Sequence, residues 1–404
     1  SILPFFWYLH RPNPSHTEQA LLSSAAAGDA NLIKHLLQPI DHPPWNNTHL
    51  LSQTDGSLHP VHHRRSDLST TCTTPPGPTM AVAVNPNCRD GSGWTPLMLS
   101  AGYGKLGVVQ VLLADSRVDL EAKNARGATA LMVAVAHAHV AVVQTLLAEP
   151  RVDVNARDGR GWRPLMFAAG LGILPIAQAL LADPRIEPEA QNAQGATAFM
   201  VAAANGHVAV VRALLADLRV DVNARDQNGW QPLTLAARHH RLEVVQALLA
   251  EPRVDPEARN AKGATALMVA AMNGYVDVAR TLLNDSRVDV NACDESGWRP
   301  LSLAARHQRL EVIQELLADP RVDPEARNMK GATALMVAAA NGHIAVVWIL
   351  LADSRIDVNA RDENRWRPLM FAASHGKAEV VQALLVDSRI NPEARNGQGA
   401  TALM

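Results

Sequence analysis

The sequence predicts an all-helical solenoid of stacked repeats. Three observations support this fold class: glycines recur every 34 residues, apolar residues between them fall at helical spacing, and Pro, Asp, Asn and Gly punctuate the intervals. Self-similarity at such a period indicates supersecondary units that bury their apolar faces only against their neighbours. We therefore expect one continuous stack, although a length of 404 residues would otherwise suggest two or three globular domains.

The glycine series sets the register of the repeats. Its members are Gly93, Gly127, Gly161, Gly195, Gly229, Gly263, Gly297, Gly331 and Gly399, with Arg365 in the remaining place. Each interval contains two helical patterns, as the segment from Pro232 to Ala250 shows. Its first apolar face combines Leu233, Ala236 and Ala237, and its second combines Val244, Val245, Leu248 and Leu249. Between units, segments such as 149–161 have the composition of a hairpin-like turn.

The chain divides into four parts on this pattern. Residues 81–404 form the array, with nine full repeats and a truncated one, and residues 17–37 repeat the two-helix rhythm as an outlying pair. Residues 38–80 are rich in Pro, Ser, Thr and His, which predicts a disordered insertion. Residues 1–16 are expected to be poorly ordered.

Helix, turn, helix and hairpin within 34 residues resemble the ankyrin repeat. Its signature T-P-L-H-x-A is divided between two alternating unit types. One keeps the proline, as in "WQPLTLA" from Trp230, and the other keeps the threonine, as in "ATALMVA" from Ala264; "WTPLMLS" from Trp94 has T-P-L intact. The histidine is mostly replaced by methionine, at Met98, Met132, Met166, Met200, Met268, Met336 and Met370. The resemblance implies an all-α, ankyrin-type helix-turn-helix solenoid with short β-hairpin loops that binds another protein in its concave groove.

The loop after each second helix departs from the family and carries an arginine in every repeat. No glycine is available there for a left-handed cap, so we expect a wider turn without positive φ. An acidic residue precedes each arginine by two positions. The arginines are Arg117, Arg151, Arg185, Arg219, Arg253, Arg287, Arg321, Arg355 and Arg389. Because they do not vary while other surface positions do, we expect them to bind helix-end carbonyls or the neighbouring loop.

Composition argues against several classes of partner. Lysine and arginine number 37 and acidic residues 39, so the net charge of −2 supplies no field for nucleic acid or an anionic membrane. The apolar stretch from Ile2 to Leu9 is too short to span a bilayer. Three scattered cysteines fit a reducing, intracellular compartment, cytoplasmic or nuclear. The opening Ser1 and the final mid-pattern "GATALM" are typical of a fragment of a longer protein.

No motif predicts catalysis, a cofactor or a metal. Gly102 to Gly107 match G-x-G-x-x-G but fall on an inter-helix turn instead of following a strand. The set His59, His62, His63, Cys72 and Cys88 lacks the paired spacings of zinc sites. We therefore expect a non-enzymatic protein.

Tryptophan follows the hairpin glycine, or Arg365, in alternate repeats, 68 residues apart. These residues are Trp94, Trp162, Trp230, Trp298 and Trp366, and the intervening repeats carry alanine. The resemblance places this position on the partner-binding groove. Two interpretations stay open: each ring packs over the next unit's alanine, or the rings are anchors for a partner.

Basic residues accompany the tryptophans. Arg157, Arg225 and Arg361 lie across the hairpin, and Arg157 is expected to form a cation–π pair with Trp162. On the first helix, Arg238-His239 returns as Arg306-His307. Together with the tryptophans, these residues are the predicted partner-binding set.

The predicted function is a protein–protein interaction scaffold. One alternative is the targeting or regulatory region of a larger enzyme, such as a kinase, or of a ubiquitin-ligase adaptor. Nucleic-acid binding by the basic hairpin row and a degenerate array without function are further alternatives. Self-association is expected through an uncapped ninth repeat, whose Leu384 and Leu385 would be exposed.

Overall fold

A computed structural model describes residues 16–37, 84–402 and 404. The expected poorly ordered segment up to residue 15 and the predicted insertion, together with Cys72 and the three histidines near it, lie outside the described residues. The chain forms two compact units, residues 1–159 and residues 160–404, which we describe separately.

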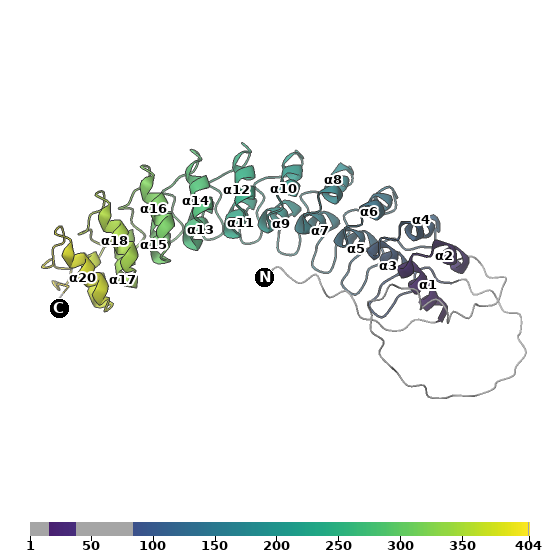
Figure 1. Cartoon of the computed structure of the whole chain (residues 1–404), viewed down its shortest axis with the longest axis horizontal. Coiled ribbons are helices and arrows are strands. Elements are labelled where there is room, and N and C mark those ends of the chain that lie inside the picture. Colours follow the sequence, from purple (N-terminus) through teal and green to yellow (C-terminus); the bar gives the residue numbers. More distant parts are fainter. Residues whose placement is uncertain (1–15, 38–83, 403) are drawn as a thin grey trace, which may run out of the picture. The chain divides into compact units, whose positions relative to one another are not determined.

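The first unit contains three helix pairs (Figure 1). Its helices are α1 (His16–Ala27), α2 (Ala30–Leu37), α3 (Pro96–Gly102), α4 (Leu106–Ala114), α5 (Ala130–Ala136) and α6 (Val140–Leu147). The first helices α1, α3 and α5 pack in one row, and the second helices α2, α4 and α6 pack in another. The predicted pair at 17–37 therefore stacks on the repeat that begins at Pro96.

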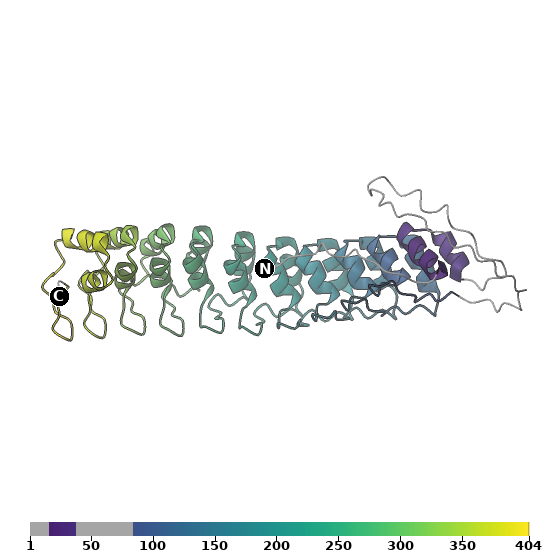
Figure 2. The ribbon, with the colours of Figure 1, turned by 90° about the horizontal axis from the view of Figure 1, so that it is seen from below.

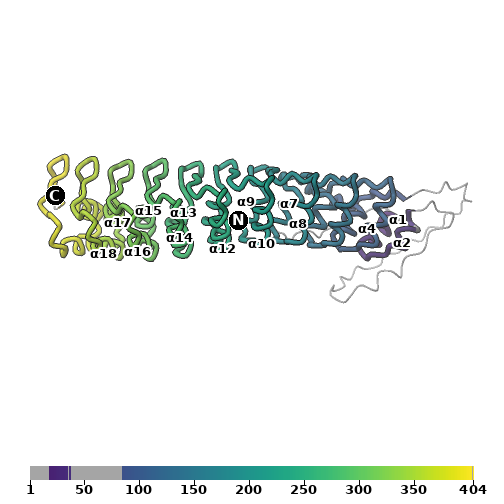
Figure 3. The backbone as a smooth tube through the Cα atoms, turned by 90° about the horizontal axis from the view of Figure 1, so that it is seen from above, coloured from purple at the N-terminus to yellow at the C-terminus, as the bar shows by residue number. Residues whose placement is uncertain are grey.

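The second unit continues the pattern with seven pairs in its described residues. They are α7 (Pro164–Leu171), α8 (Leu174–Ala182), α9 (Ala198–Asn205), α10 (Val208–Leu215), α11 (Pro232–Arg238), α12 (Leu242–Leu249), α13 (Ala266–Asn273), α14 (Val276–Leu283), α15 (Pro300–Arg306), α16 (Leu310–Ala318), α17 (Ala334–Asn341), α18 (Ile344–Ala352), α19 (Pro368–Ser374) and α20 (Ala378–Val386). First helices contact first helices and second contact second, while the hairpins of this unit project on one side of the pairs (Figures 2 and 3). The predicted all-α, helix-turn-helix stack is confirmed.

The first helices from α3 onward begin directly after a threonine or with a proline, and they bury small side chains. The hydroxyls of Thr95, Thr197, Thr265 and Thr333 accept hydrogen bonds from the backbone N–H three residues later. In the alternate repeats proline occupies the first helical turn, where its missing N–H costs nothing. The methionines that replace the family's histidine are buried in the core between neighbouring helices. Alanine on the same helices allows close packing.

The hairpins are closed turns, and the structure assigns no β-strand to them in the described residues. In the fourth hairpin of the second unit, the Asp294 N–H donates to the Trp298 carbonyl at 2.9 Å. The glycine of each tip has positive φ, and a Cβ at Gly297 would lie 2.6 Å from the backbone nitrogen of Met329 in the next hairpin. Arg365 adopts the same left-handed conformation, with φ of 61°.

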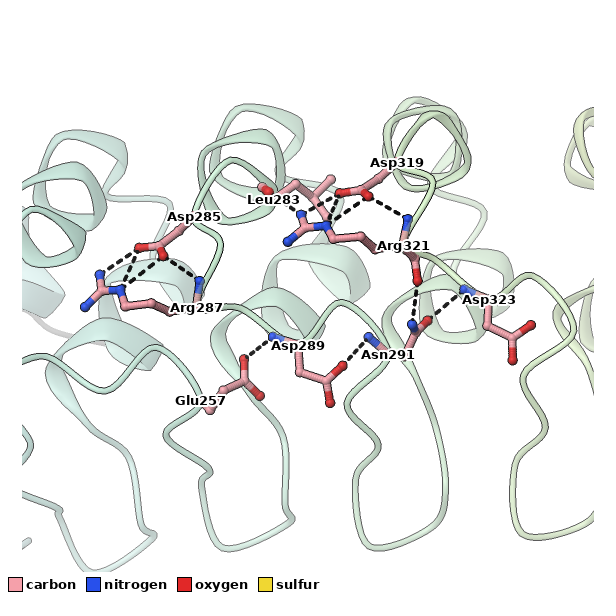
Figure 4. A network of polar contacts seen from close by, with 9 residues as sticks. All are labelled: Glu257, Leu283, Asp285, Arg287, Asp289, Asn291, Asp319, Arg321 and Asp323. Carbon is pink, nitrogen blue, oxygen red and sulfur yellow. Dashed lines mark hydrogen bonds and ion pairs between the residues drawn. The ribbon is translucent and has the colours of Figure 1, made fainter.

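The loop after each second helix bonds adjacent repeats to one another. The loop arginine donates to the carbonyl of a leucine at the end of the preceding second helix, as Arg321 does to Leu283 (Figure 4). The leucine lies 38 residues earlier in the chain, except for Arg117, whose acceptor Leu37 lies 80 residues earlier. These carbonyls lack intrahelical donors, so the arginine acts as their cap. The bonds join Arg117 to Leu37, Arg151 to Leu113, Arg219 to Leu181, Arg253 to Leu215, Arg287 to Leu249, Arg321 to Leu283, Arg355 to Leu317 and Arg389 to Leu351. No described residue of these loops has positive φ, as expected.

A second row of bonds joins the same loops. The Glu257 carboxylate accepts from the Asp289 backbone N–H at 2.9 Å. In the next repeat Asn291 accepts from Asp323 N–H at 2.8 Å and also donates to the Arg321 carbonyl at 2.7 Å (Figure 4). Glutamate and asparagine alternate here with the repeat doublet, and burial raises the pKa of Glu121, Glu189, Glu257 and Glu325, the last to about 7. An ionised glutamate cannot make the second, donating bond.

None of the described helices is both long enough and apolar enough to cross a membrane. The apolar surface at the end of α20 differs from the prediction. Leu384 is fully buried, because it faces the core of its own repeat, and the exposed side chains are Leu385 (47%) and Val386 (76%).

Candidate interaction surface

The tryptophans form a recurrent surface that we call the tryptophan face. We define it as each tryptophan, the residue eight positions later on the first helix, and the hairpin residue five positions before the tryptophan. Trp94 is buried at 8% exposure, whereas Trp162, Trp230, Trp298 and Trp366 are half-buried. Each ring therefore contributes to packing, and four of the five also reach the surface.

The residue eight positions after the tryptophan covers one face of the ring. At Gly102 and Gly170 a Cβ would lie 3.5 Å and 3.4 Å from Cζ3 of Trp94 and Trp162, so the rings there contact bare backbone. At the equivalent position after Trp230, the Arg238 guanidinium lies 4.6 Å from the ring centroid. Arg306 lies 4.9 Å from the Trp298 ring. These are cation–π distances.

The other contacts of the rings are apolar. Trp298 and Ala264 pack against a cluster of Met268, Ala292 and Leu303. Trp298 thus shares a core cluster with an alanine of the preceding repeat, and the packing of its ring over Ala332 of the following repeat stays a prediction. Phenylalanine takes the place of Leu303 in two repeats, with ring centroids 5.4 Å apart for Trp162–Phe167 and for Trp366–Phe371.

The hairpin cations alternate in their role. Arg89 and Lys123 donate to the carbonyl 34 residues later, at 2.5 Å and 2.9 Å, and Arg259 and Arg327 do the same to Cys293 and Arg361. In the tryptophan-bearing repeats of the second unit, Arg225 and Arg361 are exposed and their guanidinium groups donate no hydrogen bond among the described residues.

The cation on Trp230 is Arg238 of the first helix, and the hairpin residue that bonds the Trp230 backbone is Asp226. Arg157 is an exposed residue of the first unit and Trp162 belongs to the second, so their pairing stays a prediction.

Polar groups at the end of the first helix complete the surface. His239 is half-buried and His307 is exposed, directly after the stacked arginines. Burial, followed by the neighbouring arginines, lowers the pKa of both imidazoles, which are therefore neutral at physiological pH. Met272 lies between Arg238 and Arg306 in repeat register and is 37% exposed.

Sequence reasoning missed a row of buried arginines at the start of the first helices. Arg163 is 6% exposed and forms a 2.6 Å ion pair with Glu187, and Arg299 donates to the Asn291 carbonyl. Arg367 is 8% exposed, its Nε is buried without a partner, and burial followed by the charge of Arg361 lowers its pKa. Arg163 pairs with Glu187, 24 residues later, and the residue 24 positions after Arg367 is Asn391, which carries no charge. An acid 24 residues after a helix-start arginine is the signal that could have revealed these buried arginines.

Metal-binding clusters of three or more His, Cys, Asp or Glu side chains do not occur in the described part of the chain. Cys88 and Cys293 are free thiols, and burial raises the pKa of Cys88 to about 12, which leaves it an inert thiol.

Comparison with known proteins agrees with this architecture. The family model described as "Ankyrin repeats (3 copies)" matches residues 79–158, 165–260, 253–328 and 320–396. Among solved structures 540 chains match, one of them the crystal structure of the ankyrin repeat domain of Bcl-3, described as a unique member of the IkappaB protein family. That match has a TM-score of 0.49 and 24% identity, and it covers 52% of this chain and 94% of the other. No curated protein sequence matches. Because the family model spans more than half of its residues, this chain belongs to the ankyrin repeat family.

Proposed function

We propose that the protein is an interaction scaffold that binds a partner protein through the tryptophan face of its second unit. Ankyrin repeats are in general protein–protein interaction modules. The observation that carries the proposal is the pair Trp230–Arg238 and Trp298–Arg306, in which a half-buried ring holds an exposed guanidinium. Tryptophan and arginine are the residues most enriched among interface hot spots.

The charges around the arginines support a free binding surface. Every loop arginine of the second unit is ion-paired with an acid two positions before it, as Arg287 is with Asp285 at 2.7 Å. Arg238 and Arg306 form no ion pair and donate no side-chain hydrogen bond within the described chain. Their N–H groups are thus available to a partner, while stacking on the indole fixes the side chain before binding.

The experiment is affinity purification of partners with the full chain and with the double variant Arg238→Ser, Arg306→Ser. Serine is the residue that this chain already carries at the equivalent position, Ser374, so the repeats should fold. Trp348→Ala, an exposed tryptophan on a second helix, is the matched control. We expect the double variant to lose partners that wild type and control retain; equal recovery by all three proteins would contradict the proposal.

We also propose that copies of the chain associate through Leu385 and Val386. Their exposure supports this, since the equivalent Leu351, in α18, is 8% exposed. Light scattering of the Leu385→Glu, Val386→Lys variant should show a smaller mass than wild type at the same concentration. A wild-type chain that is monomeric at all concentrations would refute this proposal.

A further inference from the structure

The spacing of the two stacked arginines specifies the chemistry of the partner. We propose that the tryptophan face of the second unit binds an extended acidic segment with carboxylates about six residues apart and an apolar residue midway. This inference rests on the proposed function and narrows it from any protein to one class of peptide segment.

The two guanidinium groups supply the charge recognition. Each guanidinium carbon lies over an indole ring, 4.6 Å from the ring centroid for Arg238 and 4.9 Å for Arg306, and its N–H donors are available to a carboxylate. Arginine presents these donors in a planar fork that fits a carboxylate in a bidentate manner. Neither group has an acidic partner in the described chain, and the exposed Arg225 adds positive charge on the same face.

The repeat geometry supplies the spacing. Arg238 is on α11 and Arg306 is on α15, two repeats later in the row of first helices. Packed helices are about 8–10 Å apart, so two repeats separate the guanidinium groups by roughly 16–20 Å. An extended segment of the polyproline II type rises about 3.1 Å per residue, so the distance corresponds to about six residues. Because this conformation has three residues per turn, the first, fourth and seventh side chains lie on the same side.

The residue that lies between the two arginines in repeat register predicts an apolar residue in the middle of the bound segment. Met272 of α13 occupies the same repeat position as Arg238 and Arg306, and it is 37% exposed, whereas most core methionines are almost fully buried. A flexible thioether adapts to apolar side chains of different shape. The expected segment therefore reads acid, two residues, apolar residue, two residues, acid.

The surface is unsuited to nucleic acid for a related reason. Half of the hairpin cations, including Arg259 and Arg327, donate to backbone carbonyls of the next hairpin. The unpaired cations are confined to alternate repeats, and they do not form the continuous row that a phosphate backbone would need.

The test uses the full chain and three labelled peptides of the same length and net charge. The first peptide has two glutamates six residues apart with leucine midway, the second has them two residues apart, and the third replaces the leucine with serine. Fluorescence anisotropy measures Kd at two salt concentrations, with a single-stranded oligonucleotide as a further ligand. The proteins are wild type, the Arg238→Ser, Arg306→Ser variant, and a control, Arg280→Ser, which removes an exposed arginine paired with Glu315 on the second helices.

We expect the first peptide to bind at least tenfold more tightly than the second and severalfold more tightly than the third. The double variant should lose at least tenfold in affinity, whereas Arg280→Ser should change it less than twofold. Equal affinity for both spacings, no peptide binding, or preference for the oligonucleotide would overturn the inference. If the double variant loses its purified partners while no peptide binds, the proposed function survives and only the acidic-segment inference fails.

Discussion

The loop arginines and the arginines stacked on tryptophan both recur along the chain, but they have opposite surroundings. A loop arginine such as Arg321 binds an acid of its own turn at 2.6 Å and the Leu283 carbonyl of the previous repeat. Arg306 lies on an indole and has no such partner in the described chain. Satisfied hydrogen-bond donors indicate a structural role for the loop arginines, whereas the unsatisfied donors of Arg238 and Arg306 indicate a surface that binds something else. Recurrence alone therefore does not distinguish structure from function; the partners of each side chain do.

The largest effect is expected for Trp94, the one buried tryptophan among the residues that the structure describes. Trp94→Ala should lower the free energy of unfolding by about 3 kcal/mol, because it removes a ring with 8% exposure and leaves a cavity. Trp298→Ala should cost about half as much, since its ring is half-buried. Denaturant titration followed by circular dichroism measures both. Equal costs would show that all the rings are packing wedges and that the exposed face has no separate role.

A loop arginine should come next in effect. Arg321→Ala should lower stability by about 1.5 kcal/mol, because the Leu283 carbonyl loses its donor and Asp319 loses its partner. Arg321→Lys should recover less than half of this, since an ammonium cannot bind both groups in the fork geometry. Thermal melts of the two variants check the order. A stability loss below about 0.3 kcal/mol for Arg321→Ala would indicate that the loop contacts are ordinary surface pairs.

The titratable groups of the loops, Glu325 and Asp319 among them, should also give the free energy of unfolding a pH optimum. Burial raises the folded pKa of Glu325 from 4.5 to about 7, so its carboxyl destabilises the fold as pH rises from about 4.5 through 7 and the unfolded chain ionises first. The Arg321 hydrogen bond lowers the pKa of Asp319, and the stability that this pair provides is lost as pH falls below the unfolded value of 3.8.

Glu325→Gln tests the upper half of this profile. The amide keeps the acceptor and adds a donor, as Asn291 and Asn359 have in the alternate repeats. We expect a gain of about 1 kcal/mol at pH 8, after allowance for partial solvent screening, and almost none at pH 5. Melts at both pH values measure the difference. The same change at pH 5 and pH 8 would contradict the assigned titration.

The smallest effect is expected for the buried, unpartnered arginine. Arg367→Gln should stabilise the ninth repeat by about 0.5 kcal/mol, because it removes a desolvated guanidinium whose Nε has no acceptor. Glutamine occupies the equivalent position at Gln231, where it is 2% exposed. The control is Arg163→Gln, which should destabilise because Arg163 has its ion pair with Glu187. Equal shifts for both variants would show that the acid at this position is irrelevant.

Much of the fold was predictable because the same sequence pattern, and therefore the same local structure, recurs in every repeat. The 34-residue period, the proline and threonine caps, and the arginine with its acid two residues earlier each follow from the sequence. The residue that stacks on each tryptophan could not be predicted, because a ring can turn toward the hairpin or toward its own helix. Residue 238 is eight positions from Trp230, a separation that matches no simple helical or cross-strand spacing. Arg163 and Arg367 were missed because an arginine at a helix start is usually a solvated residue.

The most direct measurement compares the two kinds of arginine in matched pairs. Arg238→Ser with Arg306→Ser is set against Arg287→Ser with Arg355→Ser, two repeats apart in each case, and both melting temperature and affinity for the acidic peptide are measured. The first pair should reduce affinity at least tenfold and shift the melting temperature by less than about 1 °C. The second should lower the melting temperature by roughly 6–12 °C, since two loop arginines contribute about 3 kcal/mol at about 2–4 °C per kcal/mol, and leave affinity in the folded state within twofold. If the first pair lowers stability as much as the second, or if both pairs weaken binding equally, the division of arginines into structural and binding groups is wrong.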